Sequence, residues 1–204
     1  MKPIVLASSS PRRRRLLREL GVAFSVRVPD VDERPLSGER PGPHVRRLAL
    51  AKARAVARGL APGCAAQWVV GADTVVVLGG RILGKPRDAA DARGMLARLS
   101  GRTHEVLTGV ALVPAAGGRA RTAVVRSRVT MKPFDEATIR RYVAGGEPLD
   151  KAGSYAVQGR GRHLVARVAG SLTNVVGLPL ERLGRLFATV GVSLTPGSGG
   201  PGSR

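Results

Sequence analysis

The chain has 204 residues, of which 43% are hydrophobic, and carries a formal net charge of +20. This length and composition suit one domain with a sizeable core, and no apolar run approaches the roughly 20 residues of a membrane span. We expect one domain over residues 1–194, followed by a flexible Gly/Pro/Ser tail over residues 195–204.

Hydrophobic periodicity and capping signals predict alternating strands and helices. In chain order these are a strand over 4–7, a helix over 11–20, a strand over 24–28, a helix over 43–58, a strand over 68–78, a helix over 88–99, strands over 105–113 and 122–131, a helix over 135–144, a Gly-rich segment over 145–161, a strand over 163–168 and an amphipathic helix over 179–190. This order predicts an α/β fold with a mixed sheet.

The cysteine content and the N-terminus bear on where the protein resides. Cys64 is the single cysteine of the sequence, which excludes a disulfide framework and a cysteine metal site. The first residues lack a signal-peptide pattern. We therefore expect a cytoplasmic protein.

The positive charge raises the question of nucleic-acid binding. The 34 basic residues divide into 29 arginines and five lysines, and the arginines are scattered along the chain. Aromatic residues make up 3%, so platforms on which bases could stack are scarce. We do not expect nucleic acid to be a partner, although the charge keeps a nucleic-acid-binding module as an alternative.

The stretch LASSSPRRRR (6–15) places arginines where a helix disfavours them. Ser10 suits the N-cap and Pro11 the first helical position, so Arg12 to Arg15 crowd the positive end of the helix dipole. This arrangement indicates that a negatively charged ligand approaches the start of the helix.

Lys52 lies on the inward, apolar stripe of the helix over 43–58. Its stem could pack while the ammonium group reaches water, or the ammonium group could point into a cleft and meet an anion. Lys85 and Lys151 each lie close to glycines, and their positions in an arginine-rich chain are suggestive of the same role.

Asp73 interrupts the apolar run VVGADTVVVL (69–78). A buried carboxylate is costly unless it is paired, bound to metal or placed at a cleft, although a capping or turn aspartate remains the alternative. Asp32 and Glu33 form a second acidic site in a Pro-bounded loop, where solvation is the simpler interpretation. Two acidic sites, unusual lysines and an arginine-rich helix start would together suit a metal-bound polyphosphate.

Two other motifs do not predict chemistry. Residues 79–85 have the GxxxxGK spacing of a P-loop, but Pro86 follows where Ser or Thr should open a helix. His44, His104 and His163 share no metal-binding spacing, and we interpret them as structural or surface residues.

Together these residues resemble the Maf nucleotide pyrophosphatases. The resemblance runs from Ile4 to about Val192, through the motifs LASSSPRR (6–13), VDE (31–33), RLALAKA (47–53), GADTVV (71–76), LGKP (83–86), LSGRTHEVLTGV (99–110), YVAGGEPLDKAGSYAVQG (142–159) and NVVGLPL (174–180). It implies an elongated mixed sheet with flanking helices, in two lobes around a central cleft. It also implies a homodimer, a divalent cation (Mg²⁺, Mn²⁺ or Co²⁺), and hydrolysis of nucleoside triphosphates to the monophosphate and pyrophosphate.

The resemblance also assigns roles to residues of this chain. Asp73 matches the proton acceptor, and Lys52 and Lys85 match lysines that neutralise phosphate charge. Ser8, Arg12 and Arg13 match the phosphate-side loop and helix start. Glu33, together with Asp73, matches the site of the divalent cation.

Three positions indicate the branch of the family. Arg12, Thr74 and Gln158 are all of the type found in the branch that acts on dTTP and UTP, in contrast to the 7-methyl-GTP branch. A Gln amide both donates and accepts, which suits a thymine or uracil edge. Ala156 departs from the glycine usual in this branch. Some members of the family are linked to arrested septum formation, so a non-catalytic division regulator is a further alternative.

Overall fold

The computed structural model describes residues 4–61 and 67–192. Seven strands form one mixed sheet in the order β2-β1-β3-β5-β6-β7, with β4 paired to the free edge of β3. The strands are β1 (Ile4–Ala7), β2 (Phe24–Arg27), β3 (Trp68–Leu78), β4 (Arg81–Leu83), β5 (Thr103–Pro114), β6 (Arg121–Met131) and β7 (Val165–Ala169). The strands β2, β1 and β3 run parallel, and β3, β5, β6 and β7 alternate in direction.

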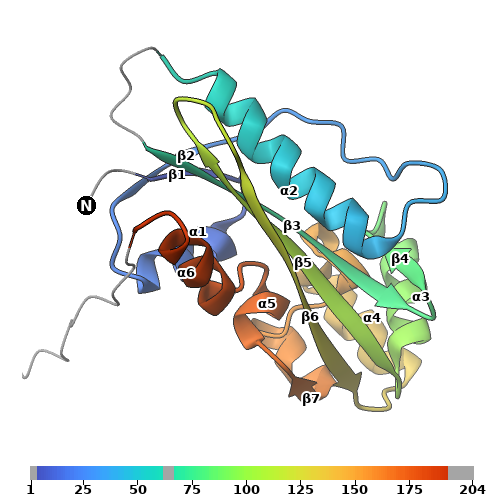
Figure 1. The fold of residues 1–204 in the computed structure, drawn as a ribbon. Helices are drawn as coiled ribbons and strands as arrows, with labels where there is room; N and C mark the ends of the chain where they lie inside the picture. Colours follow the sequence, from blue (N-terminus) through green and yellow to red (C-terminus); the bar gives the residue numbers. More distant parts are fainter. Residues whose placement is uncertain (1–3, 62–66, 193–204) are drawn as a thin grey trace, which may run out of the picture.

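Helices cover both faces of the sheet. Figure 1 shows α2 along one face and α1, α5 and α6 grouped on the other, with α3 and α4 at the right of the view and α3 beside β4. The helices are α1 (Pro11–Glu19), α2 (Pro41–Arg58), α3 (Ala89–Leu99), α4 (Glu136–Ala144), α5 (Leu172–Val176) and α6 (Leu180–Ala188). Among the described residues, none of these helices is long and apolar enough to cross a membrane.

Successive side chains of β3 point to opposite faces of the sheet, so they pack into different cores. Val69 packs with α2, whereas Val70 and Ala72 pack with α1 and α6. Further along the same strand, Val76 joins a core formed with α3 and α4. Two lobes therefore share β3, one built on α1 and α6 and the other on α3 and α4.

A gap in the pairing of β3 lies between these lobes. The strand β1 pairs with β3 only as far as Gly71, and β4 pairs with β3 from Val76 onward. Residues 72–75 therefore have no strand partner on this edge, within the segments that the structure describes. Because ligands bind at the carboxyl ends of strands in open α/β sheets, this gap beyond β1 is where a site is expected.

The helix α2 lies directly against the sheet because two glycines allow it. A Cβ atom at Gly71 would overlap the carbonyl oxygen of Ala49, and one at Gly109 would overlap that of Val45. Their absence lets the backbone of α2 contact β3 and β5 closely. This contact sets how far a side chain of α2 reaches across β3.

The structure confirms the predicted α/β class and corrects several boundaries. The helix predicted over 43–58 begins at Pro41, since Pro41 suits the first helical position. Residues 159–164, which overlap the strand predicted over 163–168, form a 3-10 turn before β7. The short elements β4 and α5 were missed, and Cys64 and residues 195–204 lie outside the described residues.

The misleading GxxxxGK segment is a hairpin. Gly79 and Gly80 both have positive φ, at 55° and 79°, and join β3 to the antiparallel β4. Such a two-residue turn with glycines is typical of a tight β-hairpin. The rejection of a P-loop on the basis of Pro86 is therefore confirmed.

Candidate active site

A cleft of about 610 Å³ opens at the gap in β3. It is lined by residues from the loop after β1, α1, the loop before α2, α2, β3, the segment after β4 and residues 150–155. A volume of this size is typical of small-molecule sites. Among the residues predicted for the site, those that line it are Ser8, Arg12, Arg13, Glu33, Lys52, Asp73, Thr74 and Lys85.

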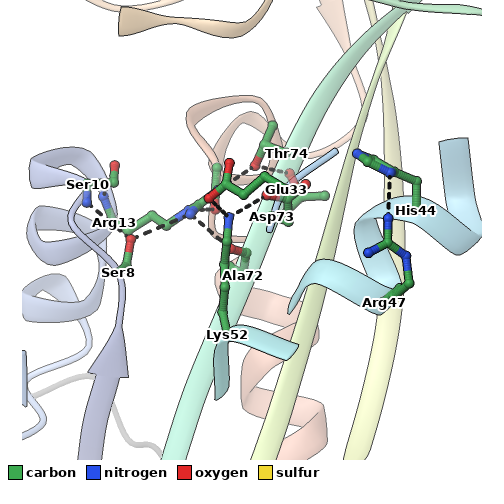
Figure 2. Close-up of polar contacts among 12 residues, drawn as sticks. Ser8, Ser10, Arg13, Glu33, His44, Arg47, Lys52, Ala72, Asp73 and Thr74 are labelled. Carbon is green, nitrogen blue, oxygen red and sulfur yellow. Dashed lines mark hydrogen bonds and ion pairs between the residues drawn. The ribbon is translucent and has the colours of Figure 1, made fainter. Parts of the chain in front are cut away.

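Lys52 and Asp73 form the buried centre of the cleft. Lys52 extends from α2, and its Nζ donates to Asp73 Oδ1 at 2.7 Å. Both side chains are less than one-tenth exposed. Figure 2 shows Lys52 pointing from α2 toward Asp73 on β3. The structure therefore places the ammonium group of Lys52 in the cleft, while its contact with a bound anion stays a prediction.

Glu33 completes this charged cluster from the loop between β2 and α2. Its Oε1 lies 2.8 Å from Lys52 Nζ, and its side chain is 54% exposed. Burial raises the pKa of Glu33, but the hydrogen bond from Lys52 and the charges of Lys85 and Arg13 bring it below its ordinary value. Glu33 is therefore a carboxylate at neutral pH, whereas its neighbour Asp32 pairs with Arg34 in solvent.

The cluster fits a divalent cation. Two carboxylates, Glu33 and Asp73, converge on one ammonium group, and Asp73 Oδ2 makes no hydrogen bond with the described residues. No cluster of three or more His, Cys, Asp or Glu side chains suited to a metal occurs in the described part of the chain. Because Mg²⁺ is often held by one or two carboxylates together with substrate phosphates, these two side chains are the ones that would hold such a cation.

The start of α1 forms the other wall. Ser10 caps the helix by accepting from Arg13 N at 3.4 Å, and Ser8 Oγ accepts from Ser10 N at 3.1 Å. The Ser8 hydroxyl, which is buried, can still donate its proton to an anion in the cleft. Arg12 lines the cleft and makes no hydrogen bond or ion pair with the described residues, so its guanidinium is available to bind phosphate oxygens.

Arg13 differs from Arg12 because its donors are used within the protein. Nε donates to Gly177 O at 2.8 Å, Nη1 to Ala72 O at 2.9 Å, and Nη2 to Thr74 Oγ1 at 3.0 Å. Figure 2 shows its side chain extending from α1 to the edge of β3. Burial lowers the pKa of Arg13, against the opposing effect of Asp73. Arg13 thus occupies the unpaired edge of β3, and little of its donor capacity is left for a substrate.

The Thr74 hydroxyl belongs to the same network. Thr108 Oγ1 donates to Asn174 O at 2.9 Å, so the contact of 2.9 Å between Thr74 and Thr108 takes its proton from Thr74. Because Thr74 also accepts from Arg13, its hydroxyl connects Arg13 to β5 and α5. Thr74 therefore lines the cleft, but its hydroxyl proton points toward Thr108 and away from the cleft.

Gln158, the third position that distinguishes the branches, does not line the cleft. It is exposed and lies three residues beyond Tyr155, which does line the cleft.

The lysine that the sequence left unassigned, Lys151, also lines the cleft and donates to Asp150 Oδ1 and Glu147 O. Its position next to glycines was the signal that could have included it among the site residues.

Two of the histidines are buried and contact other side chains of the protein, which agrees with the structural positions predicted for them. His44 is buried and lines the cleft, and His104 is buried beneath it, with its Nε2 2.8 Å from the hydroxyl of Tyr155. Burial lowers the pKa of His104 to about 4, so this side chain is neutral at neutral pH. The exposed His163 agrees with the expectation.

A second hollow of about 580 Å³ lies between α2 and β6. It is lined by apolar residues and arginines of α2 and contains no carboxylate. The catalytic candidates therefore gather in the cleft at β3. This cleft places cationic side chains next to a pair of carboxylates in an α/β protein, an arrangement suited to a phosphorylated ligand.

Comparison with known proteins identifies the group within that class. The chain belongs to the Maf family, since the family model described as Maf-like protein matches residues 3–190.

Curated relatives cover nearly the whole chain. A dTTP/UTP pyrophosphatase of Myxococcus xanthus is 52% identical over 94% of both chains. A protein of the same name from Pelotomaculum thermopropionicum is 51% identical over 95% of this chain and all of its own. Among solved structures, a nucleoside-triphosphatase/dITP/XTP pyrophosphatase from Mycobacterium abscessus covers 92% of this chain and 98% of its own at 19% identity, with a TM-score of 0.44.

Proposed function

We propose that this protein hydrolyses dTTP and UTP to the nucleoside monophosphate and pyrophosphate. The observation that carries the proposal is the Lys52–Asp73–Glu33 cluster in a cleft that also exposes Arg12 and Lys85. The names of the relatives support the substrates. Arg12 and Thr74, two of the three residues that match the dTTP/UTP branch, line this cleft.

Asp73 acts as the proton acceptor in this proposal. Its Oδ1 is held by Lys52, while Oδ2 is free of other hydrogen bonds within the described residues. Water forms a bond to one phosphorus of the anhydride between the α and β phosphates while the bond from that phosphorus to the bridging oxygen breaks, which gives the monophosphate and pyrophosphate. The proton of the attacking water passes to Asp73 Oδ2. Because the Lys52 ammonium group holds Oδ1, the Asp73 carboxylate cannot rotate away from the water. This fixed position favours the proton transfer.

The cationic side chains stabilise charge as the anhydride breaks. Arg12, whose guanidinium makes no hydrogen bond or ion pair within the described residues, binds phosphate oxygens in a planar fork. Lys85 is exposed at the cleft and contributes a mobile point charge. A bound divalent cation, held by Glu33 and Asp73, would supply further electrostatic stabilisation of the phosphates.

A substrate panel tests the proposal. Pyrophosphate release is measured with dTTP, UTP, 5-methyl-UTP, CTP, GTP and 7-methyl-GTP, with Mg²⁺ and with excess EDTA. We expect turnover of dTTP and UTP that EDTA abolishes, and rates at least about tenfold lower with the guanine nucleotides. Release of pyrophosphate from no nucleotide would reject the enzyme, and salt-sensitive binding to duplex DNA would then favour a nucleic-acid module.

We further propose a homodimer that uses Mg²⁺, Mn²⁺ or Co²⁺, as the family resemblance implies, and a cytoplasmic location, as the single cysteine indicates. Light scattering of the purified chain tests the oligomeric state. Repeating the turnover assay with Mn²⁺ or Co²⁺ in place of Mg²⁺ tests the metal preference. The three cations are then ranked by the turnover rate at saturating cation.

A further inference from the structure

Glu39 is a buried carboxylate outside the catalytic cluster. Its side chain is 8% exposed. Arg47 donates to both of its oxygens, through Nε at 2.6 Å and Nη2 at 2.7 Å. The backbone N–H of Leu36 donates to Oε2 at 3.1 Å, and His44 Nδ1 lies 2.8 Å from the same oxygen. The hydrogen bond from Arg47 holds the pKa of Glu39 well below its ordinary value, so Glu39 accepts from all three partners.

These contacts join the loop between β2 and α2 to the helix. Glu39 and Leu36 belong to the loop, whereas His44 and Arg47 belong to α2. Arg47 Nη2 also donates to Arg34 O at 3.1 Å, so one guanidinium fastens the loop at two places. Figure 2 shows His44 and Arg47 side by side on α2, with 3.4 Å between Nδ1 and Nη2.

The loop has little else to hold it. Residues 28–36 form no helix or strand, and the apolar side chains of Val28 and Leu36 are 70% and 58% exposed. A segment with few buried apolar contacts opens readily unless polar contacts restrain it. Glu33 lies within this segment and is itself half exposed, so its ion pair with Lys52 contributes little to ordering the loop.

We propose that Glu39 is a positioning residue, which with Arg47 keeps Glu33 over Lys52 and Asp73. Glu39 itself does not touch the substrate. Its contacts place the backbone on the C-terminal side of Glu33, at Arg34 and Leu36, against the same helix that carries Lys52. The two carboxylates, Glu33 and Asp73, can then bind one divalent cation without first ordering the loop. This inference rests on the proposed function for the cation, but the ordering of the loop can be measured without it.

Glu39→Gln in the full chain tests the proposal, because glutamine keeps the size but removes the charge that Arg47 and His44 contact. Hydrogen–deuterium exchange without nucleotide should accelerate at least about fivefold in peptides covering residues 31–39, while peptides from β3 and β5 stay unchanged. The Mg²⁺ concentration for half-maximal turnover of UTP should rise at least about tenfold, and kcat at saturating Mg²⁺ should stay within about threefold of wild type.

Two further variants make the test specific. Arg47→Lys keeps one charge but loses the fork and should give an intermediate rise in exchange and Mg²⁺ requirement. Asp32→Asn removes an exposed carboxylate from the same loop while its Oδ1 can still accept from Arg34 N, and should match wild type in both. If Glu39→Gln does not fold, Arg47→Lys alone decides the outcome.

Several results would overturn the proposal. Unchanged exchange over residues 31–39, or an equal acceleration throughout the chain, would show that Glu39 only stabilises the fold. Faster loop exchange with an unchanged Mg²⁺ requirement would separate the loop from the cation site. A loss of kcat that saturating Mg²⁺ does not restore would also contradict it. Absence of turnover in the wild-type protein would instead reject the proposed function, while the exchange measurement would still report on the loop.

Discussion

The charged side chains at the floor of the cleft are paired within the protein, whereas the cationic side chains at its rim are not. At the floor, Arg13, Lys52 and Asp73 are buried or partly buried, and each is already paired with another group of the protein. At the rim, Arg12 and Lys85 make no hydrogen bond or ion pair within residues 4–61 and 67–192. A paired charge is fixed in place before the substrate arrives, whereas an unpaired cation is free to bind an incoming anion. We therefore expect the floor to set the geometry of the site and the rim to supply affinity for phosphate groups.

Asp73→Asn changes the floor at the proposed proton acceptor and should have the largest effect on turnover. Asparagine keeps the shape and can still contact Lys52, but its amide cannot take a proton. Loss of a general base costs about 10²–10⁴ in rate, so kcat for dTTP at saturating Mg²⁺ should fall by that factor. Circular dichroism should show an unchanged fold, and near-normal turnover in a folded variant would remove Asp73 from the mechanism.

Lys52→Met and Lys85→Met compare a floor lysine with a rim lysine. Lys52→Met leaves the carboxylates of Asp73 and Glu33 without their counter-ion, so the free energy of unfolding should fall by up to about 3 kcal/mol and turnover should be lost. Lys85→Met should leave the melting temperature unchanged and lower kcat/KM alone. Equal melting temperatures for the two variants would contradict the distinction between floor and rim.

Arg13→Lys and Arg12→Lys make the same comparison within one helix. A lysine at position 13 cannot serve Gly177 O, Ala72 O and Thr74 Oγ1 together, which should cost about 2 kcal/mol. For a domain of this size the melting temperature should then fall by about 4–8 °C. Arg12→Lys should keep the melting temperature and raise KM for UTP through loss of the planar fork. The idea fails if Arg12→Lys is the less stable of the two.

Gln158→Glu should change base selection alone and leave the melting temperature unchanged, because this side chain is exposed and lies outside the cleft-lining residues. If Gln158 contacts the base of a bound nucleotide, glutamate loses the donor that a pyrimidine carbonyl needs, and about 1.4 kcal/mol gives a tenfold loss. We expect this loss with dTTP and UTP and a smaller one with GTP, measured as kcat/KM. A uniform decline across nucleotides, or no change, would show that Gln158 does not read the base.

The sequence predicted most long elements because their periodicity is strong. The inward stripe of α2 was visible from residue spacing, and β3 was visible as a long apolar run interrupted only near Asp73. The short elements β4 and α5 have three and five residues, too few for a periodic pattern. The β4 segment was also obscured by its resemblance to a P-loop.

The site was predicted residue by residue but not as a network. Lys52 and Asp73 each stood out as a charge in an apolar pattern, which burial makes unusual. Their mutual contact depends on how α2 crosses β3, and no local pattern encodes that crossing. The use of Arg13 within the protein and the role of Glu39 were missed for the same reason, since their partners lie on other elements or across a loop.

The close contact between α2 and the sheet has a consequence for tolerance to mutation. Gly71 and Gly109 face the backbone of the helix, and any larger residue there would push α2 away from β3. Lys52 would move with it and lose Asp73, even though neither glycine carries a reactive group. A saturation scan scored on enzyme turnover would therefore find these two glycines as intolerant as the charged cluster. A search that equates intolerance with catalysis would include two positions that never touch the substrate.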